Sequence, residues 1–170
     1  MIMSFTLSGN GKLGVLQSKV GVSIPFDGDP NINATTPKEY VGVWDTGATN
    51  SVITQKVAND LDLKPIGIKE VHTASGSELQ NQYMVNIILP NGVGIRNVFV
   101  TEGRLNQIDI LIGMDVITMG DFAISNEAEK TTMTFCMPSC HNFDFVKEFP
   151  TGIKQSRAER RRLERASKKH

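Results

Sequence analysis

"VWDTGATNSVIT", residues 43–54, places one carboxylate, Asp45, between an apolar, strand-like run and a turn of small residues. An ionised carboxylate is rarely surrounded by apolar residues unless it is paired or its environment tunes it for chemistry. Asp-Thr-Gly alone is a weak signal, because an ordinary Asx turn after a strand uses the same residue types. The rest of the chain therefore has to decide between a structural turn and a catalytic carboxylate.

The composition indicates a soluble, globular protein. The chain has 170 residues, of which 39% are hydrophobic, and this is enough for one packed domain. We expect no membrane partner, because no apolar run reaches the length of a spanning helix and residues 1–5 lack the features of a secretory signal. The expected location is therefore cytoplasmic. With only two cysteines no disulfide framework is indicated, and the thiols are expected to stay reduced there.

The charges are unevenly distributed along the chain. Residues 153–170 hold eight Lys or Arg against two Glu, whereas residues 1–152 hold ten against sixteen Asp or Glu. A capping-box pattern at Ser156–Glu159 predicts a basic helix, which should be frayed or disordered alone because Leu163 is its one strongly apolar residue. A solubilising tail is the simplest interpretation, and contact with RNA or another acidic partner is the alternative.

The body of the chain reads as many short strands. β-Branched and aromatic residues at 21–26 and 39–45 predict two strands, joined by a loop rich in turn-forming residues. Residues 83–101 alternate apolar and polar side chains on both sides of Pro90-Asn91-Gly92, which is a strong hairpin signal. The predicted fold is therefore mainly β.

Two short helices are also expected. The first starts at Thr54 as N-cap, faces Val57 and Leu61 inward and ends near Pro65. The second covers residues 115–120, with Asp115 as N-cap and a glycine at its end.

Three ordered features together raise the significance of Asp45. They are Asp45-Thr46-Gly47-Ala48 after a strand, the Gly-containing segment "VHTASGSEL" at 71–79, and "DILIGMDVI" at 109–117. Over about residues 15–135 the sequence resembles the retropepsin-like aspartic proteases, and "LIGMD" is similar to their cellular and bacterial branch. The resemblance implies a closed β-barrel of the acid protease fold with a flap hairpin, a protease domain over 1–135 and an extension over 136–170.

The resemblance also implies roles for particular residues. Asp45 would be catalytic, and Thr46, Gly47 and Ala48 would form the active-site loop. The remaining implied positions are the flap residues Thr73, Ala74, Ser75 and Gly76 and the substrate-pocket residues Leu111, Ile112 and Gly113.

Peptide hydrolysis of this kind needs a base that activates water and an acid that protonates the leaving amine, and it needs no cofactor. The sequence contains one Asp-Thr-Gly, so the second carboxylate must come from another copy of the chain in a homodimer. Asp115 is an alternative second acid, but its role as a helix N-cap is favoured. The predicted function is an aspartic endopeptidase acting on peptides or proteins, and the alternative is a non-catalytic dimerisation or peptide-binding module of the same fold.

Cys136, Cys140 and His141 spell C-x3-C-H and offer three zinc ligands. No fourth ligand follows at a usual spacing. The favoured interpretation is therefore that these are ordinary residues and that the chain holds no metal.

Overall fold

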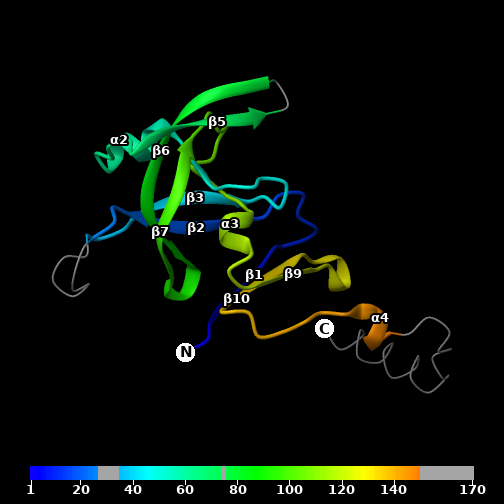
Figure 1. Ribbon diagram of the computed structural model, residues 1–170. Coiled ribbons are helices and arrows are strands. Elements are labelled where there is room, and N and C mark those ends of the chain that lie inside the picture. The colour runs from blue at the N-terminus through cyan, green and yellow to red at the C-terminus, as the bar shows by residue number, and fades with distance from the viewer. Residues whose placement is uncertain (27–34, 74–75, 150–170) are drawn as a thin grey trace, which may run out of the picture.

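The fold is taken from a computed structural model, which describes residues 1–26, 35–73 and 76–149 (Figure 1). The strands are β1 (Met3–Ser8), β2 (Gln17–Ser23), β3 (Lys38–Trp44), β4 (Val52–Ile53), β5 (Gly67–Thr73), β6 (Gly76–Leu89), β7 (Val93–Glu102), β8 (Ile110–Ile112), β9 (Asp121–Ser125) and β10 (Thr132–Met137). The helices are α2 (Gln55–Asp60), α3 (Met114–Ile117) and α4 (Phe145–Glu148), with 3-10 turns η1 (Pro90–Gly92) and η2 (Glu127–Glu129). None of the helices in these ranges is long and apolar enough to cross a bilayer.

Six strands close into a barrel. They pair in the order β2-β3-β8-β4-β7-β6, and a further pairing of β2 with β6 closes the ring. The pairs β3–β8 and β4–β7 are parallel, and the other barrel pairs are antiparallel. β5 pairs with the first half of the long strand β6, and this hairpin rises from the barrel (Figure 1). The predicted mainly β, closed-barrel fold is confirmed.

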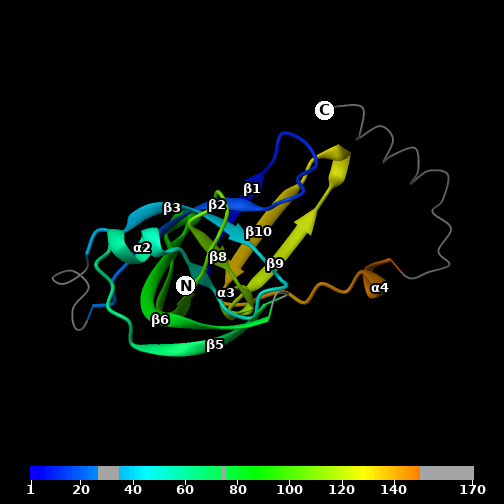
Figure 2. The same cartoon turned by 90° about the horizontal axis from the view of Figure 1, so that it is seen from above.

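A second, three-stranded antiparallel sheet has the order β1-β10-β9. It lies on the side of the barrel away from the β5–β6 hairpin (Figure 1), and in the view from above β9 and β10 run side by side past the barrel (Figure 2). The two outer strands come from opposite ends of the chain, since β1 is the first strand and β9 the last but one.

Trp44, the last residue of β3, joins the sheet to the barrel. Its ring stacks on Phe122 of β9 at 5.5 Å between centroids and packs against Phe5 of β1 and Phe135 of β10 at 5.9 and 5.5 Å. Its indole N–H donates to the buried hydroxyl of Ser18, 3.0 Å away. Aromatic pairs of this kind add about 0.5–1.5 kcal/mol each beyond the apolar area that they bury. The contacts therefore fix the backbone immediately before the Asp-Thr-Gly turn.

The hairpin predicted over residues 83–101 is confirmed. β6 and β7 pair in antiparallel register on either side of η1. Asn91 and Gly92 have φ values of 58° and 72°, the left-handed region that asparagine and glycine adopt most readily. This is the physical reason for the Asn-Gly pair at the turn.

Helix α2 also begins as predicted. The Thr54 hydroxyl accepts a hydrogen bond from the Val57 N–H, and Val57 is fully buried. The helix ends at Asp60, earlier than the expected end near Pro65, and Leu61 is half-buried.

The prediction that Asp115 caps the second helix is wrong. α3 starts at Met114, its N-cap position is Gly113 without a side-chain cap, and Asp115 lies in the first turn. The carboxylate of Asp115 instead accepts from Ser51, a residue distant in sequence. The helix ends at Ile117, before the expected glycine stop.

Parts of the sequence-based description fall outside the described residues. They are residues 27–34 of the predicted loop and residues 150–170 with the basic tail, so the tail helix and its RNA partner stay predictions. β10 continues to Met137, two residues past the boundary proposed at 135. The division into a 1–135 domain and a 136–170 extension also stays a prediction.

Candidate active site

The turn that carries Asp45 connects β3 to β4. The Asp45 N–H donates to the carbonyl of Ile112 at 2.9 Å, which continues the pairing of β3 with β8. One carboxylate oxygen, Oδ1, accepts from the Gly47 N–H at 2.8 Å, and the Asp45 carbonyl accepts from the Ala48 N–H at 3.3 Å. The carboxylate is half-buried and is held by its own turn.

The first two residues of α3 hold the other end of the turn by backbone bonds. The Met114 N–H donates to the carbonyl of Ala48 at 2.8 Å, and the Asp115 N–H donates to that of Thr49 at 3.2 Å. A Cβ added at Gly113 would lie 2.6 and 2.7 Å from the carbonyl carbon and oxygen of Asn50. Glycine is therefore required at position 113 because the two backbones touch there.

Ser51 and Asp115 form a partly buried polar link in the same place. The carboxylate of Asp115 accepts from the N–H and the hydroxyl of Ser51, at 2.9 and 2.8 Å, and the Ser51 hydroxyl accepts from the Gly113 N–H at 3.1 Å. Ser51 is fully buried. The sequence reading missed Ser51, and it assigned Asp115 to capping because its partner lies 64 positions away.

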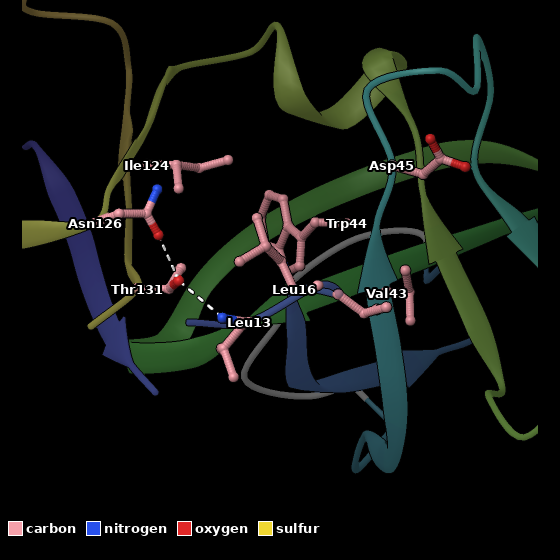
Figure 3. A pocket seen from close by; sticks show the side chains of 10 residues that line it. Leu13, Leu16, Val43, Trp44, Asp45, Ile124, Asn126 and Thr131 are labelled. Atoms are coloured by element: carbon pink, nitrogen blue, oxygen red, sulfur yellow. Dashed lines mark hydrogen bonds between the residues drawn. The ribbon is translucent and has the colours of Figure 1, made fainter. Parts of the chain in front are cut away.

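Asp45 lies at one end of an open groove of about 360 Å³ (Figure 3). At the other end the Thr131 hydroxyl donates to the Asn126 side chain at 2.6 Å and accepts from the Leu13 N–H at 2.9 Å (Figure 3). The lining residues are mostly apolar and contain one ionisable side chain, that of Asp45: Leu13, Gly14, Val15, Leu16, Val43, Trp44, Asp45, Ile124, Asn126 and Thr131. Such a surface suits apolar side chains of a bound peptide beside a single carboxylate.

The predicted pocket residues lie behind the loop. Ile112 and Gly113 are buried and Leu111 is half-buried, with Leu111 paired to Val43 and Val52 in the barrel. None of the three lines the groove described above. Their role as walls of a substrate pocket stays a prediction.

The predicted flap residues fall at the end of the β5–β6 hairpin, and their role as a flap stays a prediction. Thr73 pairs with Gly76 at its end, and Gly76 has a φ of +128°, which favours glycine. Residues 74–75 lie outside the described ranges. The ammonium group of Lys69 on β5 donates to the side-chain oxygen of Asn50 at 2.7 Å, so the hairpin is tied to the turn that carries the carboxylate.

Comparison with known proteins agrees with this geometry. Residues 32–119, just over half of the chain, match the family described as "gag-polyprotein putative aspartyl protease". The chain belongs to this family of retropepsin-like aspartyl proteases. No curated protein sequence matches the chain.

A solved structure from a bacterium shares the fold of this chain, and two viral proteases are more distantly similar. A retropepsin-like aspartic protease from Rickettsia conorii is 14% identical with a TM-score of 0.50, over 81% of this chain and 96% of that one. The EIAV protease complexed with the inhibitor HBY-793 is 19% identical with a TM-score of 0.42, and the match covers 61% of this chain and 85% of that one. The Simian Foamy Virus (mac) protease is 19% identical with a TM-score of 0.37, and the match covers 56% of this chain and 87% of that one.

The aspartyl protease turn and the possible metal ligands are separate. Within the described residues, Asp121, Cys140 and His141 cluster at the start of β9 and beyond the end of β10. None of them lines the groove beside Asp45. The chemistry that the groove itself offers is that of a carboxylate next to apolar surface.

Proposed function

We propose that the chain is an aspartic endopeptidase that hydrolyses peptide bonds as a homodimer. The observation that carries the proposal is Asp45, fixed by backbone bonds at the end of an apolar groove. A peptide hydrolase needs a surface that holds the peptide and a positioned group that activates water. Membership of an aspartyl protease family supports the same class of reaction.

The dimer follows from the number of carboxylates. The sequence has one Asp-Thr-Gly, and Asp45 is the one ionisable side chain of the groove. A twofold axis next to the turn brings the two copies of Asp45 together, because an isologous interface places the same residue on both sides of the axis. Two carboxyl groups in contact share one proton and titrate as a pair, as in other aspartic protease dyads.

The shared proton allows acid and base catalysis in one site. The ionised carboxylate takes a proton from water, whose oxygen bonds to the peptide carbonyl carbon, while the protonated carboxyl gives its proton to the carbonyl oxygen. In the tetrahedral diol that results, the amine nitrogen takes a proton from the first carboxyl. The C–N bond then breaks, and a diol hydroxyl returns its proton to the second carboxylate.

The remaining predicted residues have supporting roles in this proposal. Thr46 bonds across the axis to the partner turn, Gly47 admits the substrate backbone, and small Ala48 fits the crowded floor. The β5–β6 hairpin acts as the flap, with Thr73, Ala74, Ser75 and Gly76 at its end. Leu111, Ile112 and Gly113 lie behind the loop and support the wall of the pocket from there. The bond from Lys69 to Asn50 supports the flap role, because it links the hairpin to the active-site turn.

Replacing Asp45 by Asn tests the reaction. Asp45→Asn keeps the shape of the side chain and an acceptor for the Gly47 N–H but removes the titrating carboxylate. Cleavage of a peptide library by the full chain, followed by mass spectrometry, should fall by several orders of magnitude, while peptide binding remains. Asp62→Asn is the matched control, since the Asp62 side chain is 86% exposed on the surface. Cleavage that persists in Asp45→Asn would refute the role of Asp45.

Dilution tests the dimer. Activity per chain should rise with protein concentration until the dimer saturates, because a monomer holds half of the dyad. Full activity in samples that sediment as monomer would contradict this part of the proposal.

A wild-type protein that binds peptides but cleaves none would instead support the non-catalytic module. The cytoplasm stays the proposed compartment, a location in which the two cysteines are expected to stay reduced.

A further inference from the structure

The segment after β10 folds back onto the start of β9. Cys136 of β10 pairs with Asp121 of β9, and beyond Met137 the chain turns through residues 138–141. The Asp121 carboxylate accepts from the Cys140 and His141 N–H groups at 2.6 and 2.8 Å and from the Ser139 hydroxyl. One carboxylate thus holds a whole turn of the chain against the edge strand of the sheet.

Four side chains of the types that bind metals lie at or beside this turn. The sulfur atoms of Cys136 and Cys140 lie 3.2 Å apart, and Cys140 Sγ lies 3.1 Å from His141 Nδ1. His141 Nδ1 lies 4.0 Å from Asp121 Oδ2. The ligand atoms of Asp121, Cys140 and His141 are all within 4.8 Å of one another. Asp121 thus joins two residues of the C-x3-C-H motif, and Cys136 contacts this group through Cys140.

The separations among Asp121, Cys140 and His141 are close to those of a tetrahedral zinc ion, and the Cys136 sulfur would have to turn toward these three to complete the sphere. With Zn–S near 2.3 Å and Zn–N or Zn–O near 2.0–2.2 Å, neighbouring ligand atoms lie about 3.4–3.8 Å apart. In this structure Cys140 lies 3.2 Å from Cys136 and 3.1 Å from His141, slightly below this range. The distance of 4.0 Å between His141 and Asp121 lies slightly above it. Two thiolates, one imidazole and one carboxylate are a ligand set typical of Zn²⁺ rather than of the oxygen-preferring ions Mg²⁺ and Ca²⁺.

The groups around the four ligands fix their orientation. Ser139 and two backbone N–H groups bond to the Asp121 carboxylate, and the His141 ring stacks on Phe143 at 5.8 Å between centroids. Contacts of this kind orient metal ligands in known sites and raise metal affinity. We propose that Asp121, Cys136, Cys140 and His141 bind one Zn²⁺, which fastens the segment after β10 to the sheet.

The site is structural and separate from peptide hydrolysis. None of the four proposed ligands lines the groove at Asp45. In the proposed site all four positions of the coordination sphere would be taken by protein atoms. A closed, four-ligand sphere is typical of structural zinc, whereas catalytic zinc keeps a position for water. Zinc should therefore raise the thermal stability of the chain without entering the hydrolysis step.

Metal titration of the full-length, reduced chain tests the proposal. Cobalt(II) should bind in a ratio of one per chain, with the ligand-field absorption of a tetrahedral ion and a thiolate-to-cobalt charge-transfer band, and one equivalent of Zn²⁺ should displace it. Cys136→Ser with Cys140→Ser should abolish both absorptions. Ser139→Ala should keep the spectrum and weaken zinc binding by about 10- to 100-fold, because Ser139 acts through Asp121. Asp144→Asn, which removes a nearby carboxylate outside the cluster, should bind as wild type.

The outcomes separate this site from other uses of the same residues. Absence of a tetrahedral cobalt spectrum in the folded wild-type chain overturns the proposal without any variant. A spectrum that survives in the double cysteine variant, with folding checked by circular dichroism, overturns the assignment of the ligands. A Cys136–Cys140 disulfide that forms in air in protein that takes up no metal when reduced would assign the pair to thiol oxidation instead.

Discussion

Asp115→Ala tests how the active-site turn is held. The carboxylate accepts from the N–H and the hydroxyl of Ser51, and these bonds fasten the residue just before β4 to helix α3. The variant leaves both donors buried, because Ser51 has no exposed surface. The chain should fold with a weaker connection between the turn and the helix.

The magnitude follows from the two lost bonds. A buried donor left without a partner costs about 1–3 kcal/mol. Because Ser51 can turn its hydroxyl toward another acceptor, we expect a total of about 2–4 kcal/mol rather than twice the single value. For a chain of this length the melting temperature should fall by roughly 5–15 °C. Displacement of the turn by about 1 Å would lower cleavage by about 100-fold if Asp45 is catalytic.

Thermal unfolding followed by circular dichroism, together with peptide cleavage at 25 °C, measures both effects. Glu127→Ala is the control, since it removes an exposed carboxylate with no side-chain bond among the described residues. Asp115→Asn should lie between wild type and Asp115→Ala, because its amide oxygen can still accept from the Ser51 N–H. A folded Asp115→Ala chain that melts within 2 °C of wild type would refute the reasoning.

Three further predictions concern other contacts. Gly113→Ala should destabilise the chain by more than 2 kcal/mol in urea unfolding, about the cost of overpacking, because its Cβ would meet the Asn50 backbone at 2.6 Å. Thr54→Ala should cost about 1 kcal/mol in the same assay, since Thr54 caps α2. Burial and a 2.7 Å hydrogen bond to Glu102 raise the pKa of Tyr83 to about 12. The protonated side chain therefore stabilises the folded chain below about pH 10, the pKa in the unfolded chain, and this stabilisation is lost as the pH rises toward 12. Tyr83→Phe should flatten this alkaline loss of stability, and equal slopes for both chains would contradict the assignment.

Local signals predicted the β6–β7 hairpin, the start of helix α2 and the turn after β3, whereas the closed barrel was implied by the family resemblance. Asn91-Gly92 fixes a hairpin by the left-handed conformations that it adopts, and Thr54 starts a helix through its own hydroxyl. The Asp-Thr-Gly turn is equally local, since Asp45 bonds to Gly47 within the same loop. In each case the interacting atoms are a few residues apart, so the sequence shows both partners at once.

Contacts between distant parts of the chain were not predictable in this way. Ser51 and Asp115 are 64 positions apart, and no spacing rule indicates that their side chains meet. Asp121 lies next to Cys140 because β9 and β10 pair. It precedes both cysteines in the sequence, whereas the spacing rule for zinc ligands looks for the fourth ligand after them. The sheet β1-β10-β9 was missed for the same reason, since pairing depends on how the whole chain folds.

The pairing of β1 with β10 also orders the events of synthesis on the ribosome. Met3 pairs with Met137, so β1 has no partner strand until residues 132–137 have been made, by which time all six barrel strands, the last of them β8, have been synthesised. Contacts between such distant segments form late and slowly. The aromatic contact between Trp44 and Phe135 must wait as well, and Trp44 precedes Asp45. A nascent chain can therefore build its barrel early, but the residue next to the carboxylate is packed only when translation has passed β10.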